Sequence, residues 1–170
     1  ADTVYFLGTY GKILDPVCGP LPFGLYPYQE DALADFMSHQ YNIVLKSRQM
    51  GFSWLVAGFV LYVGMFFSNK NIQMISIKEQ TAIRLLAKVK YLYDYLPDWM
   101  KVRIIDDNKT LLTFEHGSRI ESIPTSEDAG RSEGVTLLVI DEAAFVRWID
   151  KVWQAAEPTL STGGMCILLS

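Results

Sequence analysis

The chain has 170 residues, of which 50% are hydrophobic, and its formal net charge is −4. This length and apolar content favour a globular protein with one good core and leave no room for a second domain. The negative charge excludes a broad basic surface for nucleic acid, so a contact with DNA has to be local or shared with other chains.

Cysteine and histidine give no sign of a metal site. Cys18 and Cys166 lie far apart, and no C-x-x-C or Cys/His spacing surrounds them, which indicates reduced thiols in a cytosolic protein. His39 and His116 are equally isolated, and structural roles are expected for both.

The first part of the chain predicts an irregular arm followed by a helix, a strand and a second helix. Residues 1–27 are rich in glycine, proline and aromatic residues without a sustained period, so we expect an irregular N-terminal arm. Apolar spacing predicts a short helix over residues 29–37, a buried strand over 42–45 and a buried helix over 54–67. The uncharged segment 54–67 is shorter than the ~20 residues that span a membrane, so we expect no membrane insertion.

The remaining chain alternates strands and helices. The predicted strands cover residues 72–77, 102–105, 111–114, 118–123, 136–140 and 165–169, and the predicted helices cover residues 79–95 and 143–156. The uninterrupted β-forming run 136–140 is typical of a strand buried on both faces. This alternation predicts an α/β fold with a mostly parallel central sheet, helices on both faces and ligand sites at the carboxyl ends of the strands.

The first candidate site is the octet Lys46-Ser47-Arg48-Gln49-Met50-Gly51-Phe52-Ser53, which joins the strand 42–45 to the helix 54–67. Compared with the phosphate-binding pattern G-x-x-x-x-G-K-[ST], it keeps the second glycine and the final hydroxyl, but Lys46 replaces the first glycine and Phe52 replaces the lysine. Lys46 could fold back and supply the missing charge, and Ser53 could bind Mg²⁺. An ordinary glycine-containing turn explains the octet equally well.

The second candidate site is the acidic pair Asp141-Glu142 at the end of the strand 136–140. An apolar strand that runs into two carboxylates is the form expected of the Walker B element of a P-loop NTPase. Asp141 would hold Mg²⁺ through its water shell, and Glu142 would orient and deprotonate the water that attacks the γ-phosphate. Acidic residues often follow strands, so the pair gains weight only from its place after the octet in an α/β pattern.

Together these segments resemble the ATPase domain of the large terminase subunit, the DNA-packaging motor of tailed bacteriophages and herpesviruses. The resemblance spans residues 29–170 and rests on matching segments in the family's order. These segments are the adenine-recognition segment Tyr26-Pro27-Tyr28-Gln29, the octet with its S-R-Q-x-G, the arginine-containing loop 126–134 with Val139-Ile140-Asp141-Glu142-Ala143-Ala144-Phe145, and the lead-in to the coupling motif at 158–164.

The resemblance implies a three-layer P-loop NTPase fold (RecA/ASCE-like) with ATP and Mg²⁺ as cofactors. It implies that the octet 46–53 binds ATP, with Lys46 on the phosphates, Arg48 at the γ-phosphate and Gln29 hydrogen-bonded to adenine. Ser53 and Asp141 would serve Mg²⁺, and Glu142 would be the catalytic carboxylate.

Two arginines are candidates for stabilising the transferred phosphoryl group. Arg131 could reach the nucleotide of a neighbouring subunit, whereas Arg48 could act within its own subunit. Ser132 stands where the family often has a glycine after the loop arginine, and a solvated loop arginine explains Arg131 equally well.

The function implied by the resemblance is ATP hydrolysis that drives double-stranded DNA into a procapsid. The implied partners are DNA (through the full-length motor), the portal protein, the small terminase subunit and further copies of the chain in a ring, in the host cell cytoplasm. We expect residues 28–170 to form an ATPase domain that ends before the coupling motif and lacks the nuclease domain. We therefore expect no nuclease activity from the isolated chain. We also expect the isolated chain to be a monomer, because the portal and the missing domains would organise the ring. A helicase-like ATPase remains an alternative. A nucleotide-binding or ring-assembly module without turnover is another, because Phe52 occupies the lysine position.

Overall fold

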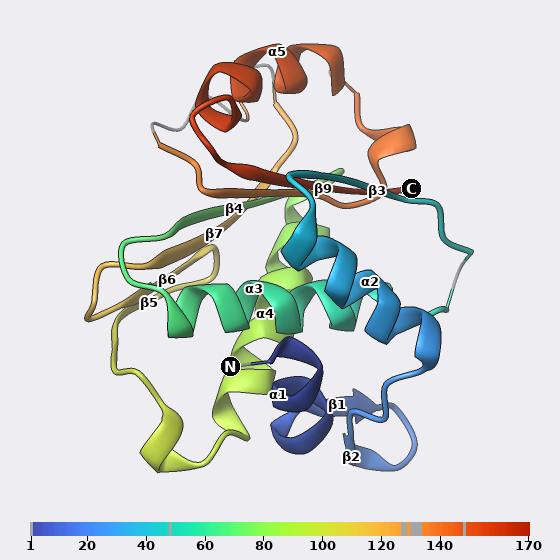
Figure 1. Ribbon diagram of the computed structural model, residues 1–170, viewed down its shortest axis with the longest axis vertical. Helices are drawn as coiled ribbons and strands as arrows, with labels where there is room; N and C mark the ends of the chain where they lie inside the picture. The colour runs from blue at the N-terminus through green and yellow to red at the C-terminus, as the bar shows by residue number, and fades with distance from the viewer. Residues whose placement is uncertain (1, 48, 127–128, 130–133, 148) are drawn as a thin grey trace.

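The computed structural model describes residues 2–47, 49–126, 129, 134–147 and 149–170 (Figure 1). The strands are β1 (Lys12–Asp15), β2 (Gly19–Pro22), β3 (Tyr41–Val44), β4 (Asn71–Ser76), β5 (Ile104–Asp107), β6 (Leu111–Phe114), β7 (Arg119–Pro124), β8 (Leu137–Ile140) and β9 (Met165–Leu169). The helices are α1 (Thr3–Tyr10), α2 (Pro27–Ser38), α3 (Phe52–Phe66), α4 (Glu79–Asp94) and α5 (Ile149–Leu160), with short 3-10 turns at Asp98–Met100 and Ala143–Phe145.

The main sheet has seven strands in the order β3-β9-β8-β4-β7-β6-β5. β3, β9, β8, β4 and β7 pair in parallel, whereas β6 pairs antiparallel with both β7 and β5. The predicted mostly parallel sheet and the predicted hairpin of β5 and β6 are therefore confirmed. Because β9 lies between β3 and β8, the two strands that precede Lys46 and Asp141 are not neighbours.

Helices cover both faces of this sheet, which confirms the predicted three-layer α/β fold. In Figure 1, α5 lies above the sheet, and α2, α3 and α4 lie below it. The buried residues of β8 alternate between the layers: Leu137 and Val139 belong to the core with α3 and α4, and Leu138 and Ile140 to the core with α5. Successive side chains of a strand point to opposite faces, so this central strand needs apolar residues at every position.

The uncharged helix α3 crosses the middle of the larger core. Eleven of its 15 residues are buried, which confirms the predicted buried helix. Gly58 allows α1 to approach α3, because a Cβ at this position would lie 2.5 Å from Cδ2 of Leu7. No helix in the described part of the chain has the length and apolarity needed to cross a membrane.

The described part of residues 1–27, from Asp2 onward, does not form the expected irregular arm. It contains α1 and the antiparallel hairpin of β1 and β2. Oδ1 of Asp2 accepts a hydrogen bond from N of Val4 at 2.8 Å and caps α1, while Phe6, Leu7 and Phe23 are buried in the core with α3. Eight residues are too few for a helix that is stable alone, so packing against α3 stabilises α1, and no clear period marks it in the sequence.

Two other expectations were wrong. The strand before the octet is not buried, because β3 is the edge strand of the sheet; Ile43 is 72% exposed, and Leu45, which follows β3, is 84% exposed. The helix predicted over residues 143–156 is replaced by a 3-10 turn and by α5, which begins at Ile149. Val146 has an extended backbone and a buried side chain that packs in the core with α5, so the apolar spacing continues across a break in the helix.

Candidate functional site

The octet forms the connection between β3 and α3, and its beginning is fixed by backbone hydrogen bonds. N of Lys46 donates to O of Ser170 at 2.7 Å, and N of Ser170 donates to O of Val44 at 2.9 Å, which continues the β3–β9 ladder. Gly51 precedes α3 with a φ of +73°, in the left-handed region that favours glycine. A Cβ there would also lie 2.9 Å from Nε2 of Gln29.

This connection surrounds a cavity of about 190 Å³ at the N-terminus of α3. The described residues that line it are Lys46, Ser47, Gln49, Met50, Gly51, Phe52, Ser53, Trp54 and Lys88. Phe52 and Ser53 belong to the first turn of α3, whose N–H groups have no acceptor within the helix. Such a turn attracts anions through these N–H groups and through the helix dipole.

The acidic end of β8 contacts the described part of the octet through an ion pair. Nζ of Lys46 lies 3.7 Å from Oδ1 of Asp141, and only 17% and 9% of the two side chains are exposed. N of Asp141 donates to O of Ile75 at 2.9 Å, which extends the β8–β4 ladder by one residue. The two predicted sites, far apart in the sequence, are therefore neighbours in the fold.

Glu142 follows in a strained conformation. Its φ is 53° and its ψ is 44°, which place a residue other than glycine in the left-handed region. Its N donates to Oδ1 of Asp141 at 3.0 Å, while its side chain is exposed. The carboxylate of Glu142 is thus available to solvent next to a buried carboxylate.

Phe52 does not present its side chain as the lysine of a standard P-loop would. It is 6% exposed and belongs to the core with α3, and its ring centroid lies 6.0 Å from that of Tyr28. The loop therefore gains no positive charge at this position.

The predicted adenine segment packs directly against the octet. Nε2 of Gln29 donates to O of Met50 at 3.0 Å, and the hydroxyl of Tyr28 donates to the same oxygen at 3.2 Å. Oε1 of Gln29 accepts from N of Tyr26 at 3.1 Å, and the rings of Tyr26 and Tyr28 stack with centroids 5.6 Å apart. Gln29 is 2% exposed, so it joins this segment to the loop and is not the solvated helix-start glutamine that is common elsewhere.

Arg48 and Arg131 lie outside the described residues, as does Ser132. Their predicted roles therefore stay predictions. The part of the loop 126–134 that the structure describes includes Ala129, which is buried in the core with α5.

Lys88 reaches the cavity from α4, although its sequence context did not mark it as a site residue. Its Nζ lies 5.7 Å from the ring centroid of Trp54. Burial lowers the pKa of Lys88, Asp141 raises it, and the positive charge of Lys46 lowers it further. The sequence does indicate that Lys88 faces the core. It lies three residues after Leu85 and four before Leu92, both on the buried side of α4.

Asp141 and Ser53 are the candidate ligands for a cation. Among the described residues, no group of three or more His, Cys, Asp or Glu side chains could hold a metal ion. Mg²⁺ does not need such a group, since it is commonly held by one or two carboxylates together with phosphate oxygens and water. A buried carboxylate next to an anion-attracting helix N-terminus therefore fits Mg²⁺ that arrives with a phosphorylated ligand.

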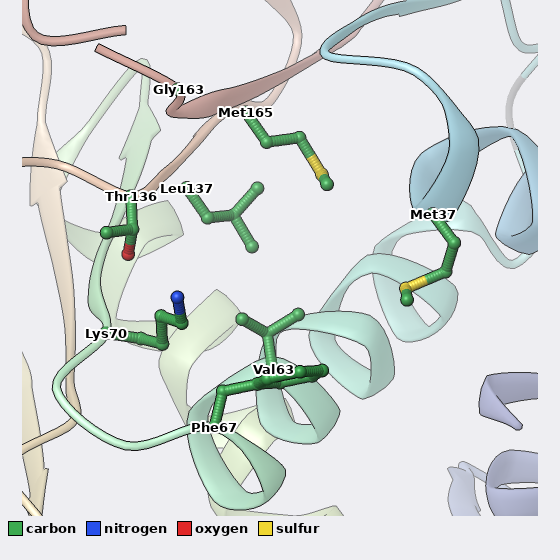
Figure 2. A pocket seen from close by; sticks show the side chains of 8 residues that line it. All are labelled: Met37, Val63, Phe67, Lys70, Thr136, Leu137, Gly163 and Met165. Atoms are coloured by element: carbon green, nitrogen blue, oxygen red, sulfur yellow. The ribbon is translucent and has the colours of Figure 1, made fainter. Parts of the chain in front are cut away.

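A second cavity, of about 210 Å³, lies at the other end of the parallel strands, where β4, β8 and β9 begin (Figure 2). Lys70, Thr136 and Gly163, which precede β4, β8 and β9, help to line it together with apolar side chains such as Val63 and Phe67. Figure 2 shows the Lys70 side chain pointing into this space. Because ligand sites of parallel sheets lie at the carboxyl ends of strands, we assign the functional site to the cavity at the octet.

Comparison with known proteins agrees with this geometry. The family model described as "Terminase large subunit, T4likevirus-type, N-terminal" matches residues 43–165. Among solved structures, the HK97 bacteriophage large terminase superposes with a TM-score of 0.76 at 16% identity, over 99% of this chain and 36% of that chain.

Two thermophilic phage proteins show the same fold. The large terminase ATPase domain of Thermus phage P74-26 matches with a TM-score of 0.57 at 20% identity, over 76% of this chain and 58% of that one. The large terminase of another thermophilic bacteriophage, in complex with ATP-gamma-S, matches with a TM-score of 0.57 at 15% identity, over 79% of this chain and 33% of that one. The chain thus spans about a third of the HK97 protein and of the ATP-gamma-S-bound protein. Because the family model covers more than half of its residues, the chain belongs to the family of large terminase subunits of tailed phages, in their N-terminal, ATPase-domain region.

Proposed function

We propose that the chain binds and hydrolyses ATP with Mg²⁺ and that this hydrolysis drives double-stranded DNA into a procapsid. The observation that carries the proposal is the ion pair between Lys46 and Asp141, which joins an anion-attracting loop to the acidic end of β8. Support also comes from a thermophilic bacteriophage terminase of similar fold, which is described in complex with ATP-gamma-S and with ADP.

The phosphates would lie at the N-terminus of α3. Backbone N–H groups of the octet, which comprises Lys46, Ser47, Arg48, Gln49, Met50, Gly51, Phe52 and Ser53, would face them. The Lys46 ammonium would turn from Asp141 to the phosphates, a small change for a flexible side chain that already lines the cavity. Ser53 and Asp141 would hold Mg²⁺, which supplies positive charge to the phosphate oxygens.

Glu142 would orient and deprotonate the attacking water. Its exposed carboxylate follows the buried Asp141 directly, and its backbone is in the left-handed region. Strained backbone of this kind is common where a side chain has to be positioned for function. Charge on the transferred phosphoryl group would be stabilised by Arg48 in the same subunit or by Arg131 from a neighbouring one.

The base of ATP would bind beside α2. Gln29 donates one N–H of its amide to Met50, and its other N–H would serve the adenine edge once the base displaces the groups that leave this side chain 2% exposed. The stacked rings of Tyr26 and Tyr28 offer a flat apolar surface at the same place. Because Gln29 touches the loop, base recognition and phosphate binding would be coupled through Met50.

The working assembly would be a homo-oligomeric ring that operates with the portal protein and the small terminase subunit in the host cell cytoplasm. Residues 28–170 would be the ATPase domain, and we propose that this chain alone is a monomer without nuclease activity. With a net charge of −4, the chain would touch DNA locally, and most contacts would come from other parts of the motor.

A second candidate is a nucleotide-binding or assembly module without turnover, because Phe52 buries the position that normally carries the lysine. ATP turnover per chain, measured against protein concentration, separates the two. A rate per chain that rises with concentration supports hydrolysis completed by Arg131 between subunits, and a constant rate supports Arg48 within one subunit. Nucleotide binding without turnover at any concentration would contradict hydrolysis and favour the module.

A further inference from the structure

Lys88 is the one side chain of α4 that lines the cavity at the octet, within the described residues. α4 contributes no residue to the P-loop pattern, and the helix packs on the same side of the sheet as α3. A lysine that comes from a separate element but opens into the phosphate cradle calls for an explanation.

The loop itself lacks a charge where the P-loop pattern has one. The side chain of Phe52 is 6% exposed and packs on Tyr28, so it cannot contact phosphate. Lys46 restores one positive charge but is partly neutralised by Asp141 at 3.7 Å. A triphosphate carries several negative charges, and one lysine shared with an aspartate leaves most of them without a protein partner.

The surroundings of Lys88 keep its ammonium available and in place. Within the described residues, the Lys88 ammonium takes part in no salt bridge. By contrast, Lys46 pairs with Asp141, and Lys90 pairs with Asp107. Its Nζ lies 5.7 Å from the centroid of the Trp54 ring, a cation–π distance. Trp54 is itself held by Tyr91 of α4, with ring centroids 5.6 Å apart in an edge-on arrangement.

The electrostatics of the cavity favour an anion. Burial and the positive charge of Lys46 both lower the pKa of Lys88, and Asp141 compensates only in part. Lys46 and Lys88, both partly buried, line the cavity, and the buried carboxylate of Asp141 lies beside it. An incoming polyphosphate would therefore stabilise the charged form of both lysines.

We propose that Lys88 is a second phosphate-binding lysine, which reaches the nucleotide from α4 and supplies the charge that Phe52 cannot. This inference rests on the proposed function, since it names a further residue of the same ATP site. Trp54 acts as its positioning residue by holding the ammonium over its ring.

The test compares Lys88→Gln with Arg84→Gln in the purified chain. Arg84 is exposed on the same helix and does not line the cavity, so its substitution removes the same charge from α4 away from the site. Binding is measured for Mg²⁺-ATP, for inorganic tripolyphosphate and for adenosine. We expect Lys88→Gln to weaken ATP and tripolyphosphate at least about tenfold and adenosine less than about twofold, and Arg84→Gln to change none of them.

Adenosine binding also shows that Lys88→Gln is folded. The inference is overturned alone if Lys88→Gln binds ATP like the wild type while Lys46→Gln loses affinity. It is overturned together with the proposed function if the wild type binds neither ATP nor tripolyphosphate, or if Lys46→Gln and Lys88→Gln both bind ATP like the wild type.

Discussion

The ammonium of Lys46 lies 3.7 Å from the carboxylate of Asp141, although β9 separates the strands that lead to these two residues. This contact connects the segment before α3 with the end of the central strand β8. Both side chains are largely buried, so each limits the cost of burying the other's charge.

Removing one partner of this pair should destabilise the fold. Lys46→Ala leaves the carboxylate of Asp141 buried without its cation, and we expect it to lower the free energy of unfolding by about 3 kcal/mol in urea titrations. In the double variant Lys46→Ala/Asp141→Asn the loss should be smaller, with a coupling of at least about 1 kcal/mol. Additive effects of the two single substitutions would show that the pair contributes nothing to stability.

Gly51 should not tolerate a side chain. Gly51→Ala places a Cβ at a φ of +73° and 2.9 Å from Nε2 of Gln29, so we expect a loss of about 1–2 kcal/mol of stability and weaker ATP binding. Gly8→Ala is the matched control, because a Cβ at Gly8 in α1 has no neighbour within 4 Å. Alanine there should be neutral or stabilise the protein by up to about 1 kcal/mol. Equal melting temperatures for the two variants would refute the steric account of Gly51.

The left-handed backbone of Glu142 should lower the stability of the protein, while its carboxylate is required for ATP turnover. Glu142→Gly relieves the left-handed backbone, and we expect it to raise the free energy of unfolding by up to about 1 kcal/mol and to abolish ATP turnover. Glu142→Ala keeps the strain and removes the same carboxylate, so it should lose turnover without gaining stability. Thermal unfolding of the three proteins tests this, and a destabilised Glu142→Gly would contradict the strain.

Cys166 should react far more slowly than Cys18. Cys18 is exposed, whereas burial raises the pKa of Cys166 from an ordinary value of 9.0 to about 12. The native thiol keeps its proton while the unfolded thiol loses it, so stability should be unchanged below pH 9 and should fall as the pH rises from 9 towards 12. A thiol-reactive dye at pH 8 should label one cysteine in the native protein and two in denaturant. Rapid labelling of both in the native protein would contradict this burial.

The sequence predicted those elements whose local pattern agrees with their place in the fold. β8 is buried on both faces and therefore apolar throughout, and α3 is buried around most of its circumference. Both candidate sites were expected at the carboxyl ends of parallel strands, which lie at the same end of the sheet, but the ion pair between Lys46 and Asp141 was not predicted. The location of both sites at one end of the sheet was thus predictable, although β9 between their strands was not.

Other features depend on contacts that no local pattern reveals. α1 is stabilised by packing of Phe6 and Leu7 against α3, and nothing in its eight residues shows this. Ile43 and Leu45 are apolar yet exposed, because strand order and not composition places β3 at the edge. Lys88 reaches the cavity because α4 packs beside α3. In the sequence, its position on the core side of a predicted helix is the indication that it has a special role.

The most direct test of the proposed ATP site is ATP turnover by the wild type and by Glu142→Gln, with Mg²⁺-ATP affinity measured on the same samples. We propose that the octet and Asp141 bind the nucleotide and that Glu142 activates the water. The variant should therefore bind ATP with a Kd within about twofold of the wild type and lose turnover at least about a hundredfold. Turnover of Glu142→Gln at the wild-type rate would contradict the proposed site.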